Sequence, residues 1–208
     1  MESIVRDLER LTRPLVLACS PRKGGNTDQA AWLLAKGLAS AGADPLVVHL
    51  RDQHVLPCTG CQSCGPESGF KCVLMHRDQA ESLFRLVLGA PMLFFASPIY
   101  FYHVPALFKG FIDRAQRYFV ARNAGDPVLT AQPLRTAHAF LVGGRSRGER
   151  LFEGTLLSLR YFLWPFNATL GEDLCLYGID EPDDLRRNET ASARVEDFAF
   201  RAWKAGGQ

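Results

Sequence analysis

The sequence has no strong excess of charge of either sign. Lysine and arginine total 24 and aspartate and glutamate total 22, which leaves a formal net charge of +2 over 208 residues. A balance this close gives no electrostatic basis for binding nucleic acid or an acidic membrane surface. We therefore expect neither nucleic acid nor a membrane among the partners of the protein.

Long apolar runs are missing as well. The longest, 90–102, contains proline and is too short to span a bilayer. The segment 1–13 carries charges of both signs and lacks the apolar stretch of a secretory signal, so we expect a cytoplasmic protein. With 47% apolar and 22% charged residues, the composition excludes a disordered, collagen-like or coiled-coil chain.

Several catalytic and nucleotide-binding patterns are also absent. The sequence contains neither Gly-x-Gly-x-x-Gly nor Gly-x-x-x-x-Gly-Lys-Ser/Thr, which argues against a dinucleotide clamp and a nucleoside triphosphate loop. No Ser-His-Asp arrangement and no pair of carboxylates stands out, and the five histidines lack metal-ligand spacing. No side chain is therefore predicted to act as a catalytic acid, base or nucleophile.

The sequence does contain short apolar runs that alternate with amphipathic segments. The apolar runs predict buried strands at 15–19, 46–50, 91–97, 137–142 and 174–177. The amphipathic segments predict helices at 28–41, 79–88, 104–119, 149–163 and 188–203, the last capped by Asn188. Uninterrupted apolar strands between helices are typical of a parallel sheet covered on both faces. The sequence therefore predicts an α/β, doubly wound parallel sheet of five strands.

The domain organisation follows from length and from the lack of a linker. At about 150 residues per domain, the chain is long enough for one domain with an insertion. No internal repeat or low-complexity tract interrupts it, so 1–208 is predicted to be a single domain with a cysteine-rich insertion loop at 51–76. The first dozen residues are predicted to add an amphipathic helix that packs on the sheet or on a second subunit.

A candidate anion-binding loop, SPRKGGNT at 20–27, follows the first predicted strand. Ligands of doubly wound sheets bind outside the carboxyl ends of the strands. Gly24 and Gly25 permit a backbone that aims several N–H groups inward, and the next helix presents its positive end. The loop also supplies short donors and positive charge from Ser20, Arg22, Lys23, Asn26 and Thr27. A monophosphate fits this loop; a plain strand-to-helix turn capped by Asn26 and Thr27 is the alternative.

Four of the six cysteines lie close together, at Cys58, Cys61, Cys64 and Cys72. The first three are spaced as the first three ligands of a bacterial ferredoxin, whereas the gap before the fourth is longer than in that pattern. The spacing is compatible with a [4Fe-4S] cluster on these four thiolates, which is the interpretation that the family resemblance described below favours. Free thiols and a structural zinc ion remain alternatives, and a disulfide is disfavoured in a reducing cytosol. The other two, Cys19 and Cys175, are predicted to be small core residues.

Three blocks of the sequence together resemble the NADPH-dependent FMN reductase family. They are SPRKGGNT after the first strand, PCTGCQSC with KC after the second, and SPIYFYHVPALFKGFIDR after the third. The resemblance covers about 14–178 and is strongest to the iron–sulfur flavoprotein branch. It implies a flavodoxin-like fold with strand order 2-1-3-4-5, bound FMN and a homodimer or homotetramer.

The resemblance also implies roles for individual residues. The FMN phosphate would be held by Ser20, Arg22, Lys23, Gly25, Asn26 and Thr27. The isoalloxazine ring would be lined by Pro98, Ile99, Tyr100 and Phe101. A third FMN loop is matched more loosely by Gly143, Gly144 and Arg145.

Two weaker candidates lie beside these segments. His103 adjoins the predicted flavin loop and is a candidate substrate contact, with a solvent-facing helix start as the alternative. Arg145, Arg147 and Arg150 are candidates for binding the phosphate of a nicotinamide cofactor, with a solvated basic loop as the alternative.

The sequence thus predicts an FMN-dependent oxidoreductase of the NAD(P)H-dependent FMN reductase type. It would carry a [4Fe-4S] cluster and move electrons between NAD(P)H or a protein donor and a small-molecule or protein acceptor. FMN would carry the chemistry while the protein positions and tunes it. Two alternatives stay open: a cluster-free NAD(P)H:FMN or quinone reductase, and a non-enzymatic electron carrier.

Overall fold

The computed structural model describes residues 12–206, so the helix predicted for the first dozen residues lies outside the described residues. In this part of the chain five parallel strands form one sheet in the order β2-β1-β3-β4-β5. The strands are β1 (Leu15–Ala18), β2 (Leu46–His49), β3 (Met92–Pro98), β4 (Arg135–Gly143) and β5 (Ala168–Tyr177). The predicted fold class and strand order are confirmed.

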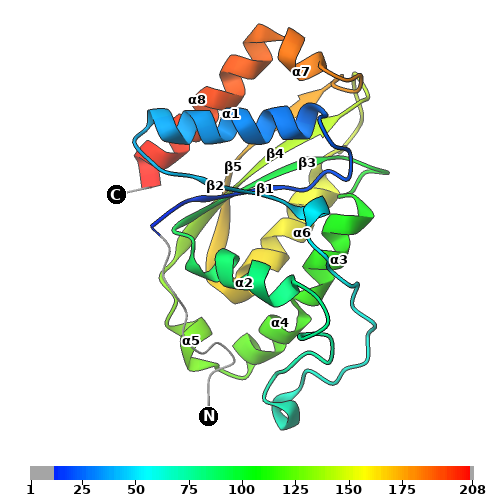
Figure 1. Cartoon of the computed structure of the whole chain (residues 1–208), viewed down its shortest axis with the longest axis vertical. Helices are drawn as coiled ribbons and strands as arrows, with labels where there is room; N and C mark the ends of the chain where they lie inside the picture. The colour runs from blue at the N-terminus through cyan, green and yellow to red at the C-terminus, as the bar shows by residue number, and fades with distance from the viewer. Residues whose placement is uncertain (1–11, 207–208) are drawn as a thin grey trace.

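Helices cover both faces of the sheet (Figure 1). The α-helices are α1 (Asn26–Ser40), α2 (Ala80–Gly89), α3 (Ala106–Arg114), α4 (Gln116–Asn123), α5 (Pro127–Thr130), α6 (Glu153–Leu163), α7 (Asp184–Arg187) and α8 (Glu189–Gly206). Three short 3-10 helices are η1 (Leu50–Asp52), η2 (Pro66–Ser68) and η3 (Trp164–Phe166). Helices α1 and α8 lie on one face, and α2, α3, α4 and α6 lie on the other.

The apolar core has two layers, one on each face of the sheet. Successive side chains of a strand point to opposite faces, so Phe94 packs in one layer while Phe95 packs in the other. The layer beneath α2, α3 and α6 is rich in aromatic rings; Phe84, for example, stacks on Phe111 with their centroids 4.5 Å apart. Because both faces are covered, the central strands β1 and β3 are apolar except for the buried Ser97 near the end of β3, as the sequence predicted.

The two edge strands differ from their predictions. Strand β2 was predicted to be buried, but its four residues are only half-buried because one side of it has no neighbouring strand. Strand β5 begins at Ala168, although the sequence predicted a start near 174. The prediction missed its first half, which is polar and partly exposed at the opposite edge of the sheet. Polar residues at an edge carry no apolar signal, so periodicity alone finds only the last few residues of this strand.

The helix predicted at 104–119 is two helices, α3 and α4, which meet at Ala115. The expected apolar face holds through Phe108 and Phe111 and then gives way to buried Arg114 and Arg117. Helix α6 begins at Glu153, after turns at 149–152 that the sequence assigned to the helix. Within residues 12–206 no helix is both long and apolar enough to cross a bilayer.

Strand β4 starts with a buried arginine that donates hydrogen bonds to the C-terminal end of α2. Arg135, 7% exposed, donates through Nη1 to the carbonyl oxygens of Val87, Leu88 and Ala90 at distances of 2.8–2.9 Å. Its Nη2 donates to the carbonyl of Phe166 at the end of η3. The last carbonyls of a helix have no partner within the helix, so one guanidinium here satisfies several of them at once. Arg135 thereby joins α2, β4 and η3.

A buried histidine makes stability depend on pH near neutrality. His138 of β4 is 5% exposed and stacks on Phe94 with ring centroids 5.1 Å apart. Burial lowers the pKa of His138 below its usual 6.5, although the Glu172 carbonyl near its Nδ1 opposes this. The unfolded chain therefore binds this proton more readily than the folded one, and stability falls as the pH drops below about 6.5.

We expect His138→Gln to flatten this dependence. Urea unfolding at pH 7.5 and 5.5 measures the loss for each protein, and one proton contributes at most about 1.4 kcal/mol per pH unit. The wild type should lose more stability than the variant between these values, while their difference should stop changing with pH above 7.5. Equal losses in the two proteins would show that a group other than His138 causes the loss of stability at low pH.

Candidate functional site

The loop between β1 and α1 has the geometry of an anion site. Gly24 adopts a positive φ of 71°, and its N–H donates to Asp28 Oδ2 at 2.7 Å. Gly25 stands at the N-cap of α1, and no side chain caps the first-turn N–H groups. Uncapped N–H groups at the positive end of a helix favour a negatively charged ligand.

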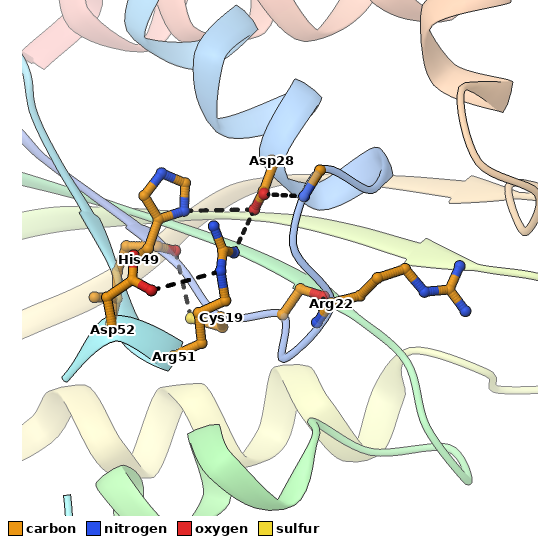
Figure 2. Close-up of polar contacts among 9 residues, drawn as sticks. Cys19, Arg22, Asp28, His49, Arg51 and Asp52 are labelled. Atoms are coloured by element: carbon orange, nitrogen blue, oxygen red, sulfur yellow. Dashed lines mark hydrogen bonds and ion pairs between the residues drawn. The ribbon is translucent and has the colours of Figure 1, made fainter. Parts of the chain in front are cut away.

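A charged cluster at the end of β2 holds this loop from behind (Figure 2). Asp28 Oδ1 accepts a hydrogen bond from Arg51 Nη1 at 2.7 Å and lies 3.4 Å from His49 Nδ1. One carboxylate oxygen of Asp28 therefore lies toward Arg51 and His49, while the other accepts the Gly24 N–H. Arg22 points away from this cluster, and its guanidinium reaches the carbonyl of Asp180 at 3.4 Å.

Not every polar group of the loop is available to a ligand. The Asn26 side chain accepts from Leu185 N at 3.0 Å and donates to the Glu181 carbonyl at 2.9 Å, so it ties α1 to the start of α7. Its backbone N–H is what faces the loop as a first-turn donor of α1. The Ser20 hydroxyl, 4% exposed, accepts from Arg22 N at 3.1 Å.

Two adjoining cavities open at the carboxyl edge of the sheet. A small one of about 60 Å³ is lined by Ser20, Arg22, Gly25, Asn26, Thr27, Pro98, Ile99, Tyr100, Val142, Gly144, Ile179 and Asp180. A wider one of about 330 Å³ is lined by Ile99, Tyr100, Phe101, Tyr102, Gly143, Gly144, Arg145 and Leu151. They share Ile99, Tyr100 and Gly144, and we call them together the sheet-edge cleft.

The loop after β3 forms one wall of the sheet-edge cleft in an unusual conformation. Tyr100 and His103 form an isolated antiparallel bridge, with N–H to O distances of 2.8 and 3.0 Å. Between them, Phe101 and Tyr102 both have positive φ, 49° and 64°, and Phe101 is fully exposed. The Arg145 guanidinium lies over the Tyr102 ring, 5.8 Å from its centroid. The loop thus presents aromatic rings around the wider cavity.

The four clustered cysteines line a third cavity, away from the sheet edge. This cysteine cavity, of about 570 Å³, is bounded by Cys58, Cys61, Cys64 and Cys72 on one side and by the junction of α3 and α4 on the other. Figure 1 shows the long loop between β2 and α2 running beside these helices. Loop residues and helix residues far apart in the sequence therefore meet in one hollow.

Two buried arginines hold the cysteine loop against α3 and α4. Arg114 donates to the Leu56 carbonyl at 2.9 Å and forms an ion pair with Asp78. Arg117 donates to the Phe70 carbonyl at 2.8 Å and pairs with a carboxylate of α2. Both ends of the cysteine loop are thus fixed by guanidinium groups, although the loop contains little regular structure.

The thiols of the cavity differ in their surroundings. Hydrogen bonds from Ser63 and Thr59 lower the pKa of the exposed Cys61. Burial raises the pKa of Cys64, and the charges of the other three thiolates raise it further. Among residues 12–206, no three His, Cys, Asp or Glu side chains are grouped as ligands of a metal ion.

The chain matches the family model of the NADPH-dependent FMN reductases over residues 12–165. This segment includes the anion-binding loop, the cysteine loop and the loop after β3. The chain belongs to the NADPH-dependent FMN reductase family.

Individual relatives of this FMN reductase family member are iron–sulfur flavoproteins. One from Archaeoglobus fulgidus is 36% identical over 99 residues, which are 48% of this chain and 43% of that protein. Another, from Methanocaldococcus jannaschii, is 30% identical over 97 residues, 47% of this chain and 48% of that protein. The matches thus extend over less than half of either relative. A solved flavone reductase shares the fold, with a TM-score of 0.69, 15% identity and coverage of 94% of this chain and 63% of that one.

The structure brings most of the predicted FMN residues of this family member together. Of the thirteen, all except Lys23 line the sheet-edge cleft. Lys23 is exposed on the anion-binding loop outside both linings. The four predicted metal ligands all line the cysteine cavity. Cys19 is fully buried as predicted, but Cys175 is only partly so, because it lies on the edge strand β5.

Of the weaker candidates, Arg145 lines the sheet-edge cleft, whereas His103, Arg147 and Arg150 do not. His103 Nε2 lies 2.8 Å from Ser158 Oγ of α6, and burial together with the nearby Lys109 charge lowers its pKa. It lines neither part of the sheet-edge cleft. Arg147 and Arg150 are exposed, and Arg150 pairs with Glu153 at 2.6 Å, as in a solvated basic loop.

Several lining residues were missed from the sequence. Ile179 and Asp180 follow β5, whose predicted end at 177 was right, so the rule that ligands bind at carboxyl ends of parallel strands already pointed to them. Arg114 and Arg117 of the cysteine cavity were also missed. The sequence shows two arginines three residues apart in a helix with an apolar face, but it does not show that they are buried.

Proposed function

We propose that this protein is an FMN-dependent oxidoreductase that moves electrons between NAD(P)H, or a protein donor, and an acceptor. One observation carries the proposal. Residues from the ends of β1, β3 and β4, which resemblance to the family assigns to FMN, line the adjoining cavities of the sheet-edge cleft. Bound there, FMN supplies the redox chemistry.

The chain's own residues would bind and orient the flavin. Uncapped N–H groups of Asn26 and Thr27, with the Ser20 hydroxyl, are suited to the phosphate. Arg22 adds positive charge at the same cavity. The loop 98–101 would contact the isoalloxazine ring, with its backbone groups toward the polar edge of the ring and its side chains against the ring's apolar parts. Gly143, Gly144 and Arg145 would close the opposite side.

We further propose that Cys58, Cys61, Cys64 and Cys72 hold a [4Fe-4S] cluster, which supplies one-electron chemistry when bound. In such a cluster each thiolate binds a different iron, so the four sulfurs stand farther apart than around one ion. Four cysteines around one roomy cavity fit that need better than they fit a single zinc ion. The buried Nε–H of Arg114, which has no acceptor in residues 12–206, also fits a cavity that receives sulfur acceptors.

Further parts of the proposal concern the state of the protein. Six free cysteines suit a reducing compartment, which supports a cytoplasmic location. We propose a single domain that assembles as a homodimer or homotetramer. Exposed apolar side chains such as Leu157 and Tyr161 on α6, 54% and 70% exposed, support the assembly.

The test is an absorption spectrum of anaerobically purified protein, with flavin, iron, sulfide and zinc assayed on the same sample. Flavin bands with a broad visible shoulder and about four irons and four sulfides per chain would support the whole proposal. Flavin without iron or sulfide would overturn the cluster and leave the cluster-free NAD(P)H:FMN or quinone reductase. Exposure of Cys58 and Cys61 favours that second candidate. Protein that takes up no FMN would overturn both.

If FMN is bound, slow oxidation of NAD(P)H would separate an electron carrier from a reductase. The measurement is steady-state NAD(P)H oxidation with added flavin or quinone as acceptor. An enzyme turns over with these acceptors, whereas a non-enzymatic carrier exchanges electrons with protein partners and shows little turnover.

Gly144→Val should weaken FMN binding at least tenfold. A β-carbon at Gly144 would stand 2.7 Å from Asp180 Cγ, so it must displace that side chain, and the rest of the valine would project into the shared part of the sheet-edge cleft. Fluorescence titration of FMN into apoprotein measures the effect. Gly110→Ala on α3, where the added carbon meets only ordinary contacts at 3.9 Å, is the control. Equal affinities in the two variants would place the flavin elsewhere.

A further inference from the structure

Two buried arginines face the cysteine cavity, and the binding of FMN does not explain them. Arg114 and Arg117 both line the cavity, and their side chains are 1% and 2% exposed. Burying a guanidinium is costly unless an ion pair and hydrogen bonds compensate for lost water. Anchoring the cysteine loop needs donors, but carbonyl acceptors alone do not require a full positive charge.

The carboxylate partners of the two arginines lie outside the cavity lining. Asp78, whose side chain is 0% exposed, pairs with Arg114, and Glu81 pairs with Arg117. The lining of the cysteine cavity includes both arginines but neither carboxylate. The carboxylates of Asp78 and Glu81 therefore compensate the buried charge from outside the cavity lining, whereas both arginines line the cavity together with the thiols. Asp113 also lines it, and its carboxylate pairs with Lys109.

Arg114 has one N–H donor without a hydrogen-bond partner in residues 12–206. Its Nη1 is used by Leu56 and Asp78, whereas its Nε is buried and has no hydrogen-bond partner in residues 12–206. Arg114 and Cys72 line the same cavity, and although burial opposes this, hydrogen bonding and charge from Asp78 and Cys72 raise the pKa of Arg114. A buried N–H without an acceptor is destabilising, and a thiolate or sulfide sulfur at this place would relieve the cost.

We propose that Arg114, supported by Arg117, is a positioning residue that stabilises the reduced form of the metal centre by placing fixed positive charge against Cys72. This inference rests on the proposed cluster. The reaction concerned is the uptake of one electron by the cluster from an added reductant, with no bond made or broken and no proton moved. The added negative charge is stabilised most by a nearby cation in a site of low dielectric constant, so the charge raises the reduction potential.

The experiment is a reductive titration with dithionite, followed by electron paramagnetic resonance, on anaerobic holoprotein. Arg114→Gln removes the charge and should lower the potential by the equivalent of at least a tenfold change in the reduction equilibrium, 59 mV for one electron. Arg114→Lys keeps the charge and should recover more than half of that shift. Arg122→Gln on α4 is the matched control and should leave the potential unchanged, because that guanidinium contacts Leu129 and Asn167 outside the cavity.

Two results would overturn the inference: a wild-type potential in Arg114→Gln with full iron content, or equal shifts in the glutamine and lysine variants. If Arg114→Gln takes up no iron, Arg117→Gln decides, since the same reasoning predicts a lower potential there and an unchanged one contradicts it. Absence of iron from the wild type would instead overturn the cluster itself. The two failures are therefore distinguishable.

Discussion

Cys72→Ala is expected to remove the proposed cluster from the protein while leaving FMN bound. Cys72 is the proposed ligand farthest in sequence from the other three, and it lines the cysteine cavity together with residues of α3 and α4. Loss of one thiolate leaves one iron of such a cluster without its protein ligand. We therefore expect iron and sulfide to fall from about four to below about one per chain. The flavin-to-protein ratio should stay at its wild-type value, because the sheet-edge cleft shares no lining residue with the cysteine cavity.

Cys175→Ala is the matched control for this loss. Cys175 is also a partly exposed free thiol, but it lies on β5, and burial and the nearby Asp173 raise its pKa well above the usual range. Its removal should leave iron, sulfide and flavin unchanged. Full iron and sulfide in Cys72→Ala, measured on the same anaerobic preparations, would exclude Cys72 as a ligand.

Arg135→Met should destabilise the protein by about 3–5 kcal/mol. Four carbonyl oxygens accept hydrogen bonds from this one guanidinium. Methionine fills much of the same volume but donates nothing, so buried carbonyls at the end of α2 and of η3 lose their donor together. Such a loss is a large part of the 5–15 kcal/mol that usually separates folded from unfolded protein.

Urea unfolding of the apoprotein, followed by far-ultraviolet circular dichroism, measures this loss. Arg201→Met is the control, because Arg201 is exposed on α8 and its pairs with Asp197 and Glu172 lie in solvent. Exposed pairs contribute little, and this variant should unfold at the wild-type midpoint. A loss below about 1 kcal/mol in Arg135→Met would mean that water replaces the lost donor at the end of α2.

The central strands and the helices over them were predictable because burial gives their residues a clear pattern, apolar along each strand and amphipathic along each helix. Strands β1 and β3 are apolar apart from Ser97, since both of their faces are covered. The start of α8 was also predictable, because Asn188 Oδ1 accepts from Ala191 N at 2.9 Å as an N-cap residue should. The predictions failed at the two edges of the sheet, where β2 is only half-buried and the first half of β5 is polar.

The break between α3 and α4 shows most clearly what the sequence alone could not predict. An apolar period predicts one helix across it, and Arg114 and Arg117 would ordinarily be assigned to solvent. Their partners Asp78 and Glu81 are more than thirty residues away in the sequence, so only the fold reveals that all four meet.

The sheet-edge cleft was more predictable than the cysteine cavity for a geometric reason. Its residues directly follow strands, and parallel strands bring their carboxyl ends to one edge whatever the loops do. The side chain of Asn26 is a partial exception, because its amide binds the chain near α7 instead of facing the cleft. The cysteine loop has no such rule, and its placement depends on the two arginine anchors.

The turn at Phe101 and Tyr102 stores conformational energy next to the cleft. Left-handed backbone costs non-glycine residues roughly 1–2 kcal/mol each, and here two occur in succession. The Tyr100–His103 bridge and the Arg145–Tyr102 stack hold the turn in this shape. A planar ligand that meets a wall already ordered need not immobilise it, so less entropy is lost on association. The bridge and the contact of Arg145 with the Tyr102 ring therefore order this wall of the cleft through folding rather than through the ligand.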